Sequence, residues 1–380
     1  MQTISTEALG TRLRRAAVVC AVVVLLVTIG SYVNAMTGPS NTALGVRSVE
    51  WLRDNGAAPI VAQVESWYYS LTAPSKGGPG LTALPSVGDT AIAVSPPRRR
   101  VLYAHPARVP VIMHPALAGE GVWHATRPGL GAAPPLLVTT VRDERDYPRV
   151  VVGLAWIDTK RIQTALYAGR LEPAVTLPTR GPMEVPSTRR SRLLATFNSG
   201  FKLSDSRGGY AIDGHTYAPL ANGLATFVGY RDGHVNIVPW MHGRTAPSDV
   251  LYARQNLPLI VDHGRANPTL NTGAAWGATV GNAILVWRSG IGIDRHGDLI
   301  YAAGNDQTVI SLASALIRAG AVRAMELDIN SYWVTFISYG AWGALRPANM
   351  LPDMVRPRTR YLTPDDRDFF ALYLRRHPLH

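Results

Sequence analysis

An uninterrupted apolar segment near the N-terminus limits what this chain can fold into more than any other feature of its sequence. Residues 16–35 read AAVVCAVVVLLVTIGSYVNA and contain no charged side chain. A helix of about 20 apolar residues is long enough to cross the hydrocarbon core of a bilayer. Arg12, Arg14 and Arg15 precede the segment, and the next basic residue is Arg47. This asymmetry predicts a single membrane span with the N-terminus in the cytoplasm.

A cleaved signal peptide is the alternative interpretation of the same segment. The apolar run is longer than a typical signal-peptide core, and residues 34–36 (Asn-Ala-Met) are a poor match to a small-x-small cleavage site. We therefore expect a cytoplasmic tail at residues 1–15, an uncleaved signal anchor at residues 16–36, and an extracytoplasmic C-terminal part at the cell membrane. The lipid bilayer is thus one expected partner, through residues 16–36.

Composition narrows the possibilities for the part of the chain beyond the span. Cys20 is the only cysteine, so the outer part holds no internal disulfide and no cysteine metal site. The formal net charge is +12, but the arginines form scattered clusters without an aromatic-interleaved stripe, so we expect no nucleic acid as a partner. Anionic lipid head groups or phosphate-bearing envelope polymers fit this charge better.

Two segments without strand periodicity come before the bulk of the chain. Residues 40–71 have apolar positions at helical spacing and are expected to form a helical stalk, divided by Pro59. Residues 72–100 are rich in Pro, Gly and Ser, which is typical of a linker.

The pattern changes at about residue 101, where short apolar runs begin to alternate with Gly, Pro, Asn and Asp. One helix is expected at residues 308–318, capped by Thr308 and ended by Gly320. The predicted fold class is α+β, a β-rich mixed-sheet domain with few helices over residues 101–345. Residues 346–380 are expected to form an Arg- and Pro-rich C-terminal extension with a short helix at about 365–375. Strands are predicted at residues 136–141, 150–157, 162–168, 193–198, 224–230, 235–240, 283–288, 321–329 and 332–339.

The segment from Arg323 to Tyr332, RAMELDINSY, contains the most informative polar residues of the chain. Side chains alternate along a strand, which places Glu326, Asp328 and Asn330 together on one face. Two carboxylates this close raise each other's pKa, and they can divide into acid and base roles or share a cation. Periodicity alone leaves two interpretations open: a functional pair, or a structural pair bonded to arginine or backbone groups.

Two further segments end strands with groups suited to anions. Asn198, Ser199 and Gly200 close one predicted strand, and backbone amides beside an amide side chain suit a phosphate or a sugar hydroxyl. The same three residues also form an ordinary turn sequence. Arg288 ends another predicted strand beside two glycines, where its guanidinium is either a bidentate phosphate ligand or a surface group.

In their order along the chain, these segments resemble the phosphodiester glycosidase family, whose animal member is N-acetylglucosamine-1-phosphodiester alpha-N-acetylglucosaminidase, the "uncovering enzyme". The family has an Asn-Gly-Gly-Phe-like strand end, an Arg-x-x-Ile-Gly segment followed by Asp-Gly, a helix, and a strand ending in Leu-Asp-Gly-Gly-Gly-Ser. The resemblance covers about residues 135–340. The matching segments are residues 198–201, 288–292, 299–304, 308–318 and 327–328.

The chain departs from the family pattern at two glycine positions. Ile329, Asn330, Ser331 and Tyr332 replace the glycine-rich turn after Asp328, and Ser199 replaces the second residue of the strand end. Because glycine permits close backbone approach and unusual φ angles, these replacements imply a reshaped pocket. Either the substrate differs from that of the animal enzyme, or hydrolysis has been lost.

The resemblance implies a membrane-anchored extracytoplasmic hydrolase that cleaves the glycosidic bond of a sugar-1-phosphodiester in cell-envelope glycans. Asp328 or Glu326 would be the catalytic carboxylate, acting on water or on the oxocarbenium-like centre. A catalytically inactive envelope module that binds an anionic glycopolymer or a partner protein is the alternative. No cofactor is certain, and a divalent cation at Asp328 and Glu326 is the one candidate. The expected substrate-binding residues are Asn198, Gly200, Lys202, Arg288 and Asn330.

Overall fold

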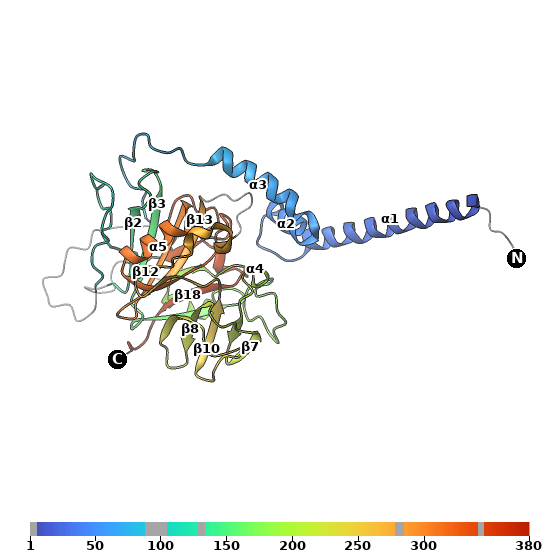
Figure 1. Cartoon of the computed structure of the whole chain (residues 1–380). Coiled ribbons are helices and arrows are strands. Elements are labelled where there is room, and N and C mark those ends of the chain that lie inside the picture. Colours follow the sequence, from blue (N-terminus) through green and yellow to red (C-terminus); the bar gives the residue numbers. More distant parts are fainter. Residues whose placement is uncertain (1–5, 88–104, 128–133, 278–284, 341–345, 380) are drawn as a thin grey trace. The chain divides into compact units, whose positions relative to one another are not determined.

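The computed structural model of the chain describes residues 6–87, 105–127, 134–277, 285–340 and 346–379. Figure 1 shows the elements in chain order. The chain divides into two units, Met1–Glu65 and Ser66–His380, each of which is described by itself below.

The first unit begins with the long helix α1 (Thr6–Thr37). Its stretch Arg12–Thr37 contains an 18-residue window with a mean hydropathy of 2.6 and is long and apolar enough to cross a membrane, as a membrane anchor or a signal sequence would be. The next helix, α2 (Leu44–Leu52), packs beside the end of α1. The indole Nε1 of Trp51 donates a hydrogen bond to Ser31 Oγ (3.1 Å), and its ring meets Tyr32 edge to face. The chain thus folds back on the apolar helix before it continues.

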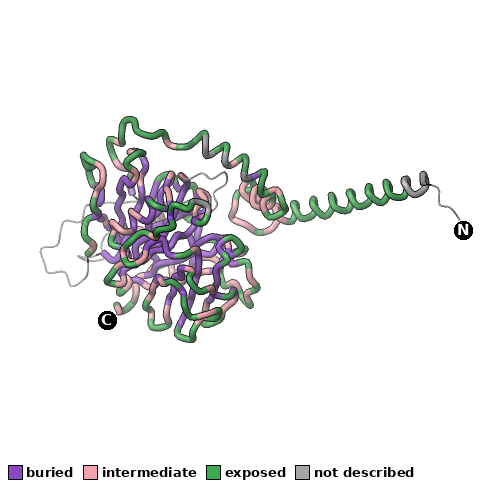
Figure 2. Tube along the Cα trace, viewed as in Figure 1, coloured by how far each residue is buried: buried purple, intermediate pink, exposed green. Residues whose placement is uncertain are grey.

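The predicted stalk contains a break, but not at the proline. The π-helical turn η1 (Arg53–Ala57) holds Gly56 at a φ of 89°, and α3 (Ala58–Thr72) starts directly after it. Pro59 is the second residue of α3, where a missing N–H removes no helical hydrogen bond. The break therefore lies at Gly56, because glycine reaches positive φ without steric penalty. Most of this unit's side chains are exposed (Figure 2).

Three β-sheets form the second unit, and every described strand pairing is antiparallel. The eight-stranded sheet has the spatial order β1 (His124–Ala125), β2 (Leu136–Arg142), β3 (Val151–Ile157), β14 (Leu299–Gln307), β13 (Val286–Asp294), β15 (Ala321–Glu326), β11 (Leu259–Asp262) and β12 (Arg265–Ala266). What we call the β10 sheet contains β7 (His215–Ala218), β6 (Tyr210–Ile212), β10 (Val250–Gln255), β8 (Ala225–Tyr230) and β9 (Val235–Pro239). The β18 sheet contains β17 (Pro347–Asn349), β16 (Phe336–Tyr339), β5 (Leu193–Asn198), β18 (Phe369–Leu374) and β4 (Ile162–Tyr167).

Aromatic side chains from all three sheets meet in one shared core. Phe370 of the β18 sheet lies 4.6 Å from Phe227 of the β10 sheet, ring centre to ring centre, and 5.3 Å from Phe197. Phe197 in turn lies 5.3 Å from Tyr301 of the eight-stranded sheet. All four side chains are fully buried, and each aromatic burial of this size contributes a large share of folding free energy. The interior of the unit is visible as the buried segments of Figure 2.

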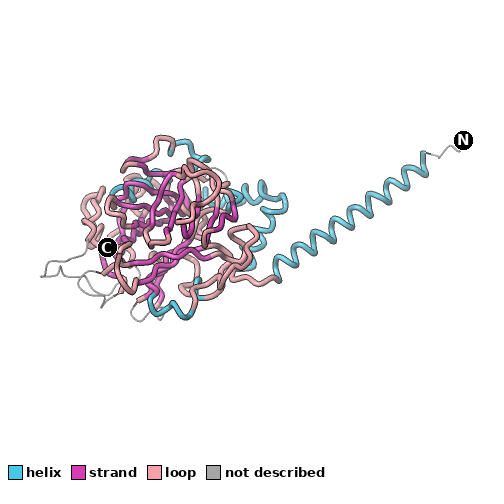
Figure 3. Tube along the Cα trace, turned by 90° about the horizontal axis from the view of Figure 1, so that it is seen from below, coloured by secondary structure: helices cyan, strands magenta, loops and turns pink. Residues whose placement is uncertain are grey.

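Few helices accompany these sheets (Figure 3). Helix α5 (Val309–Arg318) covers the eight-stranded sheet, and its capping box joins Thr308 to Ser311 as the predicted cap position requires. Gly290 of β13 makes room for it, since a Cβ there would lie 3.2 Å from Leu316 Cδ1. The remaining described helical turns are α4 (Leu203–Ser206), η2 (Ser187–Arg192), η3 (Leu270–Trp276) and η5 (Arg360–Leu362). The predicted α+β, β-rich class is confirmed, although the sheets are antiparallel in the described pairings and not mixed.

The C-terminal segment corrects two predictions. In place of a short helix at residues 365–375, the structure has strand β18, which lies between β5 and β4 in the middle of its sheet. The sequence FFALYL is apolar and aromatic throughout, and both of its faces are buried, which suits a central strand and not an amphipathic helix. Residues 346–379 therefore complete the β-rich unit and do not extend from it.

Part of the predicted linker also belongs to this unit. Gly77 N donates a hydrogen bond to Asp146 O (2.8 Å), and Arg149 binds the carbonyl oxygen of Ser75 (3.3 Å). Val87 is buried in the shared core. Residues 88–100 of the predicted linker lie outside the described residues.

Candidate functional site

The predicted site segments converge on one buried polar centre, although about 130 residues separate the first from the last. The Nδ2 amide of Asn198, at the end of β5, donates to Ser289 Oγ in β13 (3.0 Å). Ser289 Oγ donates to the carbonyl oxygen of Asp328 (2.8 Å), two residues past β15. We call the group formed by Asn198, Arg288, Ser289, Glu326 and Asp328 the polar centre.

The backbone beside β13 fixes where the two carboxylates lie. Strand β15 ends at Glu326, earlier than predicted, yet Leu327 N still donates to Ser289 O (2.8 Å) and Ser289 N to Asp328 O (3.0 Å). The backbone hydrogen bonds between β13 and the end of β15 therefore hold Asp328 as well as Glu326. Glu326 is fully buried and Asp328 is 5% exposed.

Glu326 has one paired and one unpaired oxygen. Its Oε1 lies 2.5 Å from Arg288 Nη1, whereas its Oε2 is buried without a hydrogen-bond partner. Burial raises the pKa of Glu326 to about 7, the charge of Arg288 opposes that rise, and the charge of Asp328 adds to it. A carboxyl group in this state exchanges its proton near neutral pH, which general acid–base catalysis requires.

Asp328 has a different electrostatic setting. Its Oδ2 lies 3.1 Å from Arg367 Nη2, and its Oδ1 accepts a hydrogen bond from Asn330 N (2.9 Å). The same Arg367 nitrogen donates to the carbonyl oxygen of Gly200 (3.1 Å). One arginine thus joins two of the predicted segments.

Asn198 and Arg288 use their hydrogen-bonding groups within the protein. The side-chain oxygen of Asn198 accepts from Tyr301 OH (2.9 Å) and Thr335 N (3.0 Å), and its amide donates to Ser289 and Ser199. Arg288 is 4% exposed, and apart from Glu326 it donates to the carbonyl oxygens of Gln307 and Trp276. These contacts position the strands and Glu326, and the substrate-binding roles predicted for Asn198 and Arg288 stay predictions.

The remaining predicted residues lie at the margin of the polar centre. Gly200 permits a close approach, because a Cβ there would lie 3.1 Å from Asn256 Cγ. Asn330 binds Asp328 through its backbone N–H, and its side-chain oxygen accepts from Tyr332 N (2.9 Å). Lys202 is half-buried, and its carbonyl oxygen starts the short helix α4.

Sequence reasoning missed four buried polar residues beside this centre. Asn256 Nδ2 donates to the carbonyl oxygens of Glu326 (2.7 Å) and Leu327 (3.1 Å), which holds the end of β15 in place. Arg254 Nε lies 2.7 Å from Asp368 Oδ2. For Arg367 and Asp368, the charged run PDDRD at residues 364–368, directly before an apolar run, was the feature of the sequence that could have indicated them. The missed residues are Arg254, Asn256, Arg367 and Asp368.

A divalent cation at the two carboxylates remains an untested prediction. Within the described ranges, no group of three or more His, Cys, Asp or Glu residues is arranged to hold a metal ion. Glu326 and Asp328 each face an arginine, which supplies positive charge at these positions. Cavities of about 630 and 840 Å³ lie elsewhere in the unit, and neither Glu326, Asp328 nor Arg288 lines them.

Comparison with known proteins gives distant structural likenesses only. No protein-family model and no curated protein matches the sequence. The structure is similar to the catalytic domain of zebrafish N-acetylglucosamine-1-phosphodiester alpha-N-acetylglucosaminidase auto-inhibited by its pro-peptide, with 16% identity over 65% of this chain and 85% of that one and a TM-score of 0.41. A hypothetical protein from Synechocystis (13% identity, 64% and 63% coverage, TM-score 0.38) is also similar. A third likeness is to a putative exported protein from Burkholderia pseudomallei (13%, 61% and 76%, TM-score 0.32). At these scores no residue role is carried over from them.

Proposed function

We propose that the β-rich unit is a hydrolase that cleaves the glycosidic bond of a sugar-1-phosphodiester, and that α1 anchors it at the membrane of the cell envelope. The observation behind the proposal is the contrast between two neighbouring carboxylates. Glu326 is buried with a pKa raised to about 7, and Asp328 is held by Arg367. A buried carboxyl group that exchanges its proton near neutral pH, beside a second carboxylate paired with an arginine, is suited to separate acid and base roles.

In this mechanism water attacks the anomeric carbon and the bond from that carbon to the phosphate oxygen breaks. Asp328 accepts a proton from the attacking water, and the phosphate leaves as a monoester anion. Glu326 in its protonated form donates its proton to the departing phosphate oxygen. One proton is thus taken up by Asp328 and one is released by Glu326. Arg367 is the cation nearest Asp328 and the proposed phosphate contact, while Asn198, Gly200 and Arg288 position these groups.

Kinetic measurement on the full chain in lipid nanodiscs tests this function. A panel of sugar-1-phosphodiesters is offered to the wild type and to the Asp328→Asn and Glu326→Gln variants. We expect turnover to fall by at least about 100-fold in each variant. Each change also removes the partner of a buried arginine and lowers stability, so turnover is compared only at temperatures where circular dichroism shows the variant to be folded. Asp262→Asn, which changes a solvent-accessible carboxylate on the neighbouring strand β11 that is not part of the polar centre, is the matched control and should keep full turnover.

A second function has one specific observation in its favour. Each carboxylate of the polar centre already has an arginine partner inside the protein, which is the pattern expected of structural acids. A catalytically inactive module that binds an anionic glycopolymer or a partner protein would need no free carboxylate. Absence of turnover over the whole panel, together with saturable binding of a phosphate-bearing glycan, would replace the hydrolase proposal by this one.

A further inference from the structure

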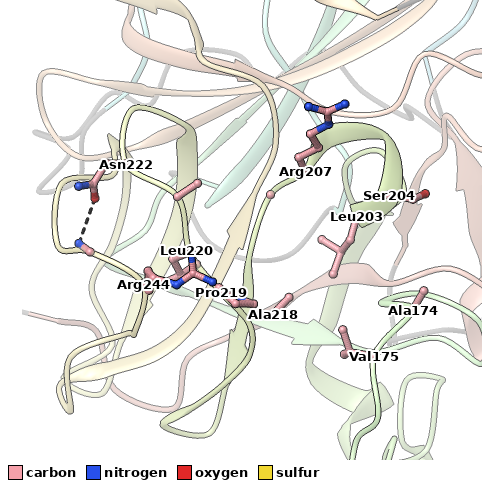
Figure 4. Close-up of a pocket in the computed structure, with 13 residues that line it drawn as sticks. Ala174, Val175, Leu203, Ser204, Arg207, Ala218, Pro219, Leu220, Asn222 and Arg244 are labelled. Carbon is pink, nitrogen blue, oxygen red and sulfur yellow. Dashed lines mark hydrogen bonds between the residues drawn. The ribbon is translucent and has the colours of Figure 1, made fainter.

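A cavity of about 630 Å³ lies on the β-rich unit, apart from the polar centre (Figure 4). Four chain segments line it: residues 174–175, 203–208, 218–222 and 243–244. Its volume falls within the range of pockets that bind small organic ligands. No residue predicted from the sequence as catalytic or substrate-binding contributes to this lining.

Buried side chains hold the walls of the cavity together. The Oε2 atom of Glu172 accepts hydrogen bonds from the backbone N–H groups of Ala174 and Leu203, each at 3.3 Å. The Oε1 atom of Gln255 accepts from Gly209 N (2.9 Å) and Ala221 N (2.8 Å). Since Glu172 and Gln255 each bind two different wall segments and are themselves buried, the shape of the cavity is set before any ligand binds.

The lining is apolar at its base and basic at its edge. Leu203 and Leu220 are 8% and 2% exposed, and both face the cavity. Arg207 and Arg244 are the charged residues of the described lining, which includes no Asp or Glu, while the carboxylate of Glu172 lies behind the wall. In Figure 4, Arg244 lies beside Leu220, whereas Arg207 lies apart from it.

Neither of these two guanidinium groups has a partner among the described residues, in contrast to the paired arginines of the polar centre. Both side chains are exposed, and arginine keeps its charge at any physiological pH. Arg207 is also the C-cap residue of α4, where a left-handed φ of 53° ends the helix.

We infer that this cavity binds a small organic anion, with its head group at the basic edge to which Arg207 and Arg244 belong and its apolar body against Leu203 and Leu220. The head group is a phosphate monoester or a carboxylate, since both pair with guanidinium groups in the same geometry. The inference does not depend on the hydrolase proposal, because the two sites share no residue.

Isothermal titration calorimetry on the full chain in lipid nanodiscs tests this site with four probes: 1-naphthyl phosphate, 1-naphthoate, 1-naphthol and inorganic phosphate. We expect one or both naphthyl anions to bind saturably. Naphthol lacks the anionic head group and inorganic phosphate lacks the apolar body, so each should bind at least about tenfold more weakly. Whichever naphthyl anion binds more tightly identifies the head group. Equal affinity for naphthol, or no saturable binding of either anion, overturns the inference.

Paired variants connect that binding to the two arginines. Arg207→Ala combined with Arg244→Ala should weaken anion binding by at least about tenfold, the loss expected for charge-assisted hydrogen bonds. The control combines Arg145→Ala with Arg376→Ala, which removes two exposed arginines outside the lining and the same total charge. Arg207→Gly, which suits the left-handed backbone, keeps the test valid if the double variant unfolds. Equal affinity in the cavity variant and its control contradicts the site, whereas Asp328→Asn should leave binding unchanged whether or not the hydrolase proposal holds.

Discussion

The two units of the chain place polarity in opposite positions. In the first unit, apolar side chains face outward: Leu44 is 61% exposed, Ile60 69% and Val64 59%. In the second unit, charged side chains are buried, and Asp365 and Asp368 are 0% and 1% exposed. Exposed apolar helices are stable where lipid takes the place of water, whereas buried charges are tolerated only with partners. The contrast teaches that apolar side chains are not always the buried ones. Whether a unit can expose an apolar side chain depends on whether lipid or water surrounds it, and whether it can bury a charge depends on an available partner.

Breaking a buried ion pair of the second unit is the strongest test of this comparison. Glu120 is fully buried, its Oε2 lies 2.8 Å from Arg142 Nη2, and its Oε1 accepts from Arg142 N (3.0 Å). Glu120→Gln leaves Arg142 without a counter-charge, so we expect a loss of about 3–5 kcal/mol in the free energy of unfolding. Urea unfolding measures this. The exposed pair of Lys76 and Asp146 gives the control, since Lys76→Ala should change stability by no more than about 0.5 kcal/mol.

Two glycines, one in each unit, test how tightly the two units are packed. A Cβ on Gly169 would lie 2.5 Å from the backbone carbonyl of Arg367, whereas nothing lies within 4 Å of a Cβ on Gly45 in α2. Gly169→Ala should destabilise the second unit by about 1–3 kcal/mol through overpacking and move Arg367 away from Asp328. Gly45→Ala should be neutral or slightly stabilising, because alanine favours helix. Thermal unfolding measures both variants. Similar losses of stability in Gly169→Ala and Gly45→Ala would contradict the expected difference in packing between the two units.

Proton binding is the next test, because buried carboxylates with raised pKa values make stability depend on pH. Burial, together with the charges of Asp294 and Asp158, raises the pKa of Asp298 from 3.8 to about 7. The folded state thus holds this proton more tightly than the unfolded state. The stability that Asp298 contributes is complete below about pH 4 and is lost as the pH rises through about 7. Asp298→Asn should therefore flatten the fall in unfolding free energy between pH 5 and pH 8, measured in urea; an unchanged slope would exclude Asp298 as a source.

The smallest expected effect is in the first unit. Ile60→Ser combined with Val64→Ser removes two exposed apolar side chains, so the unfolding free energy of the β-rich unit should change by no more than about 0.5 kcal/mol. Urea unfolding followed by near-ultraviolet circular dichroism, which reports the aromatic core, measures this. A loss above about 1 kcal/mol would show that these side chains stabilise the second unit.

The sequence predicted the local elements of the fold well and their assembly less well. The strands at 136–142, 151–157, 162–167 and 193–198 lie where short apolar runs between Gly, Pro, Asn and Asp placed them, and the helix at 309–318 lies where its helical apolar spacing placed it. Strand β18 was missed because residues 365–375 were interpreted as a short helix, although FFALYL is a short apolar run of the same kind as LLATFN in β5, which was predicted.

For the candidate site, the sequence identified the segments but not their partners. Glu326 and Asp328 were correctly predicted to lie close to one another, since both belong to one extended segment. Arg367 and Arg254 come from distant parts of the chain, so only the folded sheets bring them to Asp328 and Asp368. The same distance explains why the sequence assigned ligand-binding roles to Asn198 and Arg288, whose internal partners it could not show.

The central place of β18 has a consequence for the order of events during synthesis. Its neighbours β4 and β5 are made about 170–200 residues earlier, yet they have no partner between them until Phe369–Leu374 has been made. A chain that stops before Phe369 would leave two strands with open edges, which are templates for aggregation. The edges of β4 and β5 that face β18 therefore stay open until Phe369–Leu374 has been translated.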